Sequence, residues 1–143
     1  MAFAAPALRK AAGVVTLDAL TFTITNRQGE TVALAVVATQ ARYASTLSVR
    51  GGRIDRRFAT PAMWREIEAE IAVGLPKSAL PPSSVLTRLL ADVNERQTVQ
   101  WLHAAPVEVE RPEMAAEALD GHLRRQAVEL RLRLKHEVPR DVS

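Results

Sequence analysis

The residues of this chain best suited to binding chemistry are arginines clustered around two glycines. Four of them fall within eight residues, at Arg50, Arg53, Arg56 and Arg57. The guanidinium group is a planar fork of donors that fits phosphate and carboxylate oxygens. A two-residue turn at Gly51-Gly52 would place Arg50 across from Arg53. Like charges opposite each other repel by about 0.2–1 kcal/mol, and an anion between them would relieve that repulsion.

Aromatic residues accompany the arginine cluster at Tyr43, Phe58 and Trp64. Sites that bind nucleic acid combine basic side chains with aromatic faces on which bases stack. Phe58 and Trp64 also fit the role of core anchors where a strand leads into a helix. The cluster is therefore interpreted in two ways, as a site for an anion or protein partner and as a solvated turn.

A second basic row is predicted near the C-terminus, at Arg131, Arg133 and Lys135. These residues alternate with Leu130, Leu132 and Leu134, so a strand would present them on its polar face. Basic side chains on an edge strand also prevent two sheets from joining edge to edge. If this strand lay beside the arginine cluster, the two rows would form one basic surface.

The carboxylates Glu66, Glu68 and Glu70 lie in a predicted helix, where Glu66 and Glu70 share a face. Paired carboxylates can serve as a general acid and base. Because Ile67 and Ile71 mark the core side one position away, we interpret the carboxylate run as a solvated helix face.

Several classes of functional site are excluded or disfavoured by the residues present. The chain has no cysteine, which excludes disulfides, thiolate nucleophiles and cysteine-bound metals. His103, His122 and His136 lie in different predicted elements without metal-ligand spacing, so no metal site is expected. There is no glycine-rich phosphate loop and no serine on a glycine-flanked turn. We therefore expect a protein without catalytic residues or cofactors.

The elements that must position these residues begin with a β-hairpin. Leu20, Phe22 and Ile24 alternate with threonines, and residues 32–36 resume the alternation after a turn at Asn26–Gly29. A third strand is predicted over 45–50, followed by a turn that would pair Val49 with Ile54. The N-terminal half is thus predicted to be an antiparallel meander.

Two capped helices follow the meander. Thr60-Pro61 predicts a helix start, with an end near Val73 before Gly74. Ser83 or Ser84 should cap the next helix, whose apolar face comprises Leu86, Leu89, Leu90 and Val93.

The last third of the chain leaves more alternatives. Residues 98–102 could extend the preceding helix or form a strand, and we favour a strand that pairs with 107–109 through a turn at 103–106. Pro112 should open a helix that ends near Gln126, and the alternation over 128–135 predicts a C-terminal strand returning to the sheet. The predicted fold is a single α+β domain over 1–143, with a possible arm at 1–12 and a tail at 139–143.

Composition bounds the function classes further. The 143 residues are 48% apolar with a formal charge of +3, and no run of about eighteen apolar residues could span a bilayer. Arg9-Lys10 follow the first apolar run, whereas a secretory signal has its positive charges first. We expect a soluble, cytoplasmic or virion protein with no membrane partner.

The resulting hypothesis is a non-enzymatic structural or assembly subunit of a larger particle, such as a bacteriophage head, neck or tail component. Its partners would be protein neighbours in a homo- or hetero-oligomeric assembly. The alternative is a nucleic-acid-binding accessory protein that uses the arginine-rich hairpin. A third alternative is an enzyme whose site is built from scattered residues. A contiguous exposed apolar patch would favour the first hypothesis, a contiguous basic face the second and a deep polar pocket the third.

Overall fold

A computed structural model describes residues 13–92 and 96–131. Its centre is a five-stranded antiparallel sheet in the order β4-β3-β2-β1-β5. The strands are β1 (Val15–Thr25), β2 (Thr31–Ala38), β3 (Tyr43–Ser48), β4 (Ile54–Arg57) and β5 (Thr98–Val109). The helices are α2 (Pro61–Val73), α3 (Val85–Leu90) and α4 (Ala115–Glu129), with short 3-10 turns η1 (Thr39–Ala41) and η2 (Pro112–Met114). The predicted α+β class and N-terminal antiparallel meander are confirmed.

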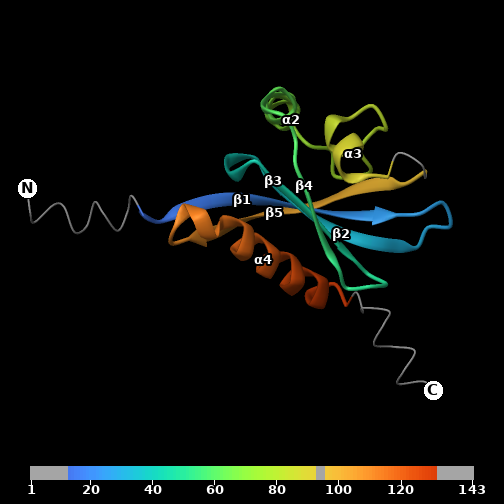
Figure 1. Ribbon diagram of the computed structural model, residues 1–143. Helices are drawn as coiled ribbons and strands as arrows, with labels where there is room; N and C mark the ends of the chain where they lie inside the picture. Colours follow the sequence, from blue (N-terminus) through green and yellow to red (C-terminus); the bar gives the residue numbers. More distant parts are fainter. Residues whose placement is uncertain (1–12, 93–95, 132–143) are drawn as a thin grey trace, which may run out of the picture.

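Helices cover both faces of the sheet, so the chain has two apolar layers (Figure 1). On one face, α2 and α3 pack Trp64, Ile67 and Leu86 against Phe22 and its neighbours. On the other face, α4 packs Leu119 and Leu123 against β2, β3 and β5. Because both faces are covered, β2 is buried at every position from Leu34 to Ala38.

The β1–β2 hairpin has the predicted turn. The Asn26 side chain accepts hydrogen bonds from the backbone N–H groups of Gln28 and Glu30, and Gly29 has φ 83. A residue with a side chain would be strained at that positive φ. Leu20 to Ile24 pair with Val37 to Ala33, which confirms this hairpin.

The β3–β4 connection differs from the prediction. Leu47 pairs with Ile54, and the N–H of Val49 donates to the carbonyl of Val32 on β2. Because Val49 continues the pairing with β2, the chain turns through 49–53. The two-residue turn, the Val49–Ile54 pair and the Arg50–Arg53 opposition were therefore wrong. Gly52, at φ 66, donates its N–H to the Ser48 carbonyl inside this longer loop.

The helix starts in the middle of the chain are confirmed. Thr60 accepts a hydrogen bond from the N–H of Met63 at the start of α2, and Gly74 follows the helix with φ 114. The Ser84 hydroxyl caps α3 by accepting from the N–H groups of Leu86 and Thr87. Helix α3 ends at Leu90, before the predicted face reaches Val93, which lies outside the described residues.

Residues 98–109 form one continuous strand. The prediction of strand structure is confirmed, but the hairpin within it was wrong. All of β5 pairs with β1, from Thr25–Thr98 to Val15–Val109, with a bulge near Leu102. Pro106 is tolerated because β5 is an edge strand, where an absent N–H removes no bond within the sheet. His103, predicted in a turn, therefore lies in the middle of a strand.

The predicted C-terminal strand is contradicted where the structure describes it. Val128 and Glu129 belong to α4, and Arg131 follows the helix with φ 56. Leu119, Leu123 and Ala127 recur every four residues on the buried face, so a longer helix buries more apolar surface. Residues 132–135 lie outside the described residues.

Candidate functional site

The four clustered arginines do not form one patch, because strand geometry separates them. Successive side chains on a strand point to opposite faces. Arg56 thus lies on the α4 face of the sheet and Arg57 on the face covered by α2 and α3. Arg50 and Arg53 are exposed in the 49–53 loop and at the start of β4.

Arg56 binds within the protein. Its Nη2 lies 2.8 Å from Oδ2 of Asp120 on α4, and the hydroxyl of buried Tyr43 donates to Oδ1 of the same carboxylate. Burial raises the pKa of Asp120 above its ordinary value, and the nearby Arg124 partly opposes that shift. This cluster joins β3 and β4 to α4, so Arg56 has a structural partner that the sequence did not reveal.

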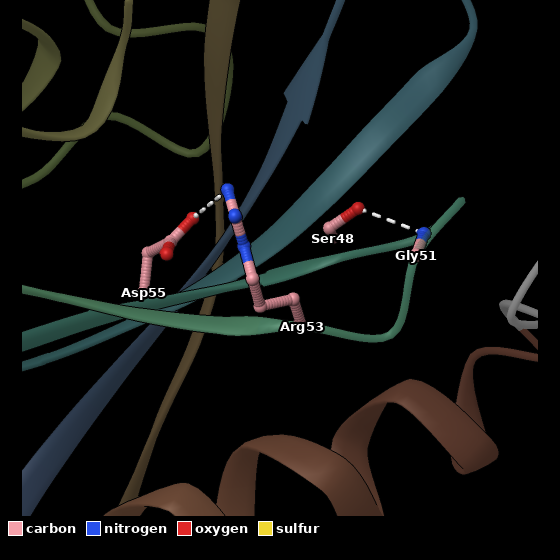
Figure 2. Close-up of polar contacts among 4 residues, drawn as sticks. All are labelled: Ser48, Gly51, Arg53 and Asp55. Atoms are coloured by element: carbon pink, nitrogen blue, oxygen red, sulfur yellow. Dashed lines mark hydrogen bonds and ion pairs between the residues drawn. The ribbon is translucent and has the colours of Figure 1, made fainter.

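The other arginines of the cluster have different surroundings. Arg53 forms an ion pair with Asp55 two residues along, at 3.1 Å, as Figure 2 shows beside the Ser48–Gly51 hydrogen bond. Arg57 is half-buried, and its Nε has no hydrogen-bond partner among the described residues. Arg50 has no ion-pair partner in the described part of the chain.

The second predicted basic row is described at one position. Arg131 is exposed after α4 and is not part of a strand. Arg133 and Lys135 lie outside the described residues. A joint basic surface with the arginine cluster stays a prediction.

The three aromatic residues also separate. Trp64 is buried on the α2 side of the core, which confirms it as an anchor, and Tyr43 is buried with its hydroxyl on Asp120. Phe58 is 87% exposed just after β4, so its assignment as a core anchor was wrong. The ring of Phe58 is therefore exposed beside Arg57, at the β4 edge of the sheet.

Glu70 has a structural role that the sequence analysis missed. Its carboxylate accepts hydrogen bonds from the hydroxyl of Ser84 and the N–H of Val85, which lie at the start of α3. Glu66 and Glu68 are exposed, as predicted for a solvated helix face. A capping carboxylate from another helix has no sequence signal, because α2 and α3 are separated by a proline-rich linker.

A row of four polar residues, interrupted by Val36, crosses the sheet beneath α4. Cross-strand pairing aligns His103, Thr21, Val36, Ser45 and Arg56 in order from β5 to β4. The buried hydroxyls of Thr21 and Ser45 have no hydrogen-bond partner among the described residues, and neither does Nε2 of His122 on α4. Burial lowers the pKa of His122, with further lowering from Arg125 and His103, while Glu129 opposes the shift.

An apolar groove lies where α2 ends and the linker to α3 begins. It has a volume of about 490 Å³, and its apolar lining includes Val73, Leu75, Pro76, Leu80 and Pro81. Val73 is 89% exposed at its rim. Exposed apolar side chains around a hollow are typical of protein-binding surfaces.

A larger hollow of about 700 Å³ lies at the end of the sheet that carries the β1–β2 turn. Arg27, Arg88 and Arg96 line it from the turn, from α3 and from the residues before β5. Arg27 is far in sequence from Arg88 and Arg96, so charge clustering along the chain could not reveal that the three lie together. We call this the basic hollow.

No metal-binding cluster among the described residues and no match to a known protein assigns a function to these sites. Within residues 13–92 and 96–131, no three His, Asp or Glu side chains gather as they would to hold a metal ion. In the same ranges, no helix has the length and apolar character needed to cross a membrane. Nothing matches the chain among protein-family models, curated proteins or solved structures.

Proposed function

We propose that this chain is a non-enzymatic structural subunit of a larger particle, such as a bacteriophage head, neck or tail component. The apolar groove beside Val73 is the observation that supports this proposal. An exposed apolar side chain at the rim of an apolar hollow loses contact with water when a neighbouring subunit covers it. The proposed partners are protein neighbours, and the proposed location is the cytoplasm or the virion.

The described arginines support this proposal over the nucleic-acid alternative. Arg56 and Arg53 have carboxylate partners within the protein, and Arg57 points away from Arg56. A contiguous basic face built from this cluster would require all of them to be available on one side.

Val73→Lys tests the subunit proposal. A lysine in the last turn of α2 suits the helix dipole, so folding should be retained, with a change in the free energy of unfolding within about 0.5 kcal/mol. The measurement is the mass of the variant alone and its incorporation into the particle purified from the native host. We expect the folded variant to be left out of the particle.

Val128→Lys is the matched control, since Val128 is also exposed, at the end of α4 and away from the groove. It should enter the particle like the parent. Equal incorporation of the Val73 and Val128 variants would refute the role of the groove.

A second candidate function is binding to single-stranded nucleic acid, supported by the exposed ring of Phe58 beside Arg57. Stacking on an aromatic ring contributes about 1–3 kcal/mol per base, and each lost phosphate contact lowers the salt slope by about 0.7 log units for single strands. The test is oligonucleotide affinity against salt concentration for Arg50→Gln/Arg57→Gln/Phe58→Ala, with Arg56 retained because it pairs with Asp120. Unchanged affinity and slope would remove this candidate.

A further inference from the structure

Arginines gather at one end of the sheet, with Glu30 and Asp92 among them, and glutamates gather at the other end around Arg111. Strand β5 runs the whole length of the sheet, from Thr98 beside Thr25 to Val109 beside Val15. Twelve residues of strand span about 35–40 Å. Figure 1 shows the β1–β2 turn at one end of the sheet and the start of α4 at the other.

One end carries the basic hollow. Arg27, Arg88 and Arg96 are exposed around it, and none has an ion-pair partner among the described residues. Asn26 and Gln97 also line a second hollow of about 350 Å³, which brings Arg50 to the same end. Asp92 is the described carboxylate on the wall of the basic hollow.

The opposite end carries exposed carboxylates. Glu108 lies at the end of β5, Glu110 just after it, Glu113 in η2 and Glu117 in the first turn of α4. None of them has an ion-pair partner in the described ranges. Glu117 also interacts favourably with the dipole of α4 at the N-terminal end of that helix. Glu108, Glu110 and Glu113 lie outside α4. We call Glu108, Glu110 and Glu113 the acidic end.

We propose that the acidic end of one copy docks into the basic hollow of the next, so that copies of this chain join head to tail. The inference rests on the proposed function and names the partner as a second copy. The acidic end carries three carboxylates around Arg111, and the basic hollow carries three guanidinium groups and Asp92, so the two surfaces have opposite net charge. Arginine binds carboxylates through paired hydrogen bonds.

The contact joins two different surfaces of the chain, so it can repeat from copy to copy. Each added copy leaves one free acidic end and one free basic hollow. Such heterologous contacts give closed rings when the rotation between copies closes, and filaments when it does not. Surface ion pairs are screened by salt, so the assembly should weaken as ionic strength rises.

Two neutralised variants test the contact without placing new charges. The hollow variant carries Arg27→Gln, Arg88→Gln and Arg96→Gln, and the end variant carries Glu108→Gln, Glu110→Gln and Glu113→Gln. The measurement is the mass of each full-length protein by sedimentation, at low and high salt, over a concentration series. The parent should form species larger than two copies at low salt, and each variant alone should stay a monomer.

An equimolar mixture of the two variants is the decisive sample. The end variant keeps its basic hollow and the hollow variant keeps its acidic end, so one productive contact can form per pair. We expect a heterodimer of twice the monomer mass and nothing larger. The control, Arg65→Gln/Arg124→Gln/Arg125→Gln, removes the same charge from exposed positions elsewhere and should assemble like the parent.

Several results would contradict the proposed contact, and each has a different meaning. A monomeric parent at all concentrations, assembly by either variant alone, or a mixture that stays monomeric would overturn the head-to-tail contact. A hollow variant that assembles normally but loses affinity for an added oligonucleotide would assign the hollow to nucleic acid instead. The Val73→Lys incorporation test is independent, so the subunit function can survive the failure of this contact.

Discussion

At the scale of single residues, His122 couples the packing of α4 to pH. The side chain is buried, and Arg125 and His103 add positive charge to an environment in which burial already disfavours protonation. Glu129 is the neighbouring carboxylate that opposes this effect. The native state therefore binds a proton on His122 at a lower pH than the unfolded chain does.

We predict that the free energy of unfolding falls as pH drops below about 6.5, the ordinary pKa of histidine. Between that value and the lowered native pKa, the unfolded chain binds more protons, so acidification favours unfolding. Urea unfolding of the parent and of His122→Leu, at a series of pH values from about 7.5 to about 5, measures the effect. The variant should lose less stability than the parent, and parallel pH curves would contradict this assignment.

Side-chain partners were the part of the site least accessible from sequence at this scale. Arg56 was predicted as a binding residue because three other arginines lie near it in the chain. Its partner Asp120 is 64 positions away, and the register of β4 decides that they meet. The arrangement of charges along a short segment cannot reveal a partner so far away in the sequence.

At the scale of elements, Leu89 tests how α3 is oriented. It is buried between α3 and the sheet, within a helix of six residues. Leu89→Ala should lower the free energy of unfolding by about 2–5 kcal/mol, through lost burial and the cavity left behind. Chemical denaturation measures the change, with Val128→Ala as an exposed control; a loss within about 0.5 kcal/mol would show that Leu89 does not face the core.

The junction of α2 and α3 depends on the Glu70 carboxylate. Glu70→Ala removes hydrogen bonds from the Ser84 hydroxyl and the Val85 N–H, and should cost about 0.5–2 kcal/mol, as loss of a helix cap does. Glu68→Ala, at an exposed position of the same helix, should leave stability nearly unchanged. If thermal unfolding shows equal losses for both variants, the cap does not stabilise the junction.

At the scale of the whole molecule, stability should be independent of metal ions. The core is formed by two apolar layers on a sheet, and no metal-binding cluster occurs within the described residues. The melting temperature should therefore be the same before and after treatment with a strong chelator. A lowered melting temperature or loss of the cooperative transition would show that the fold requires a metal.

The sequence by itself determined the features that depend on neighbouring residues. The Asn26–Gly29 turn, the helix starts at Thr60-Pro61 and at Ser83 or Ser84, and the α+β class each follow from preferences over a few neighbouring positions. The absence of cysteine likewise excluded whole classes of chemistry without any structure.

Only the tertiary structure decided which distant residues meet. Residues 98–109 form a single strand because β1 offers a partner along their whole length, and α4 continues through Val128 because its helical course buries Ala127. The same strand register sends Arg56 to Asp120, and the fold gathers Arg27, Arg88 and Arg96 around one hollow. The physical reason is that pairing and burial are interactions between segments far apart in the chain, which local periodicity cannot record.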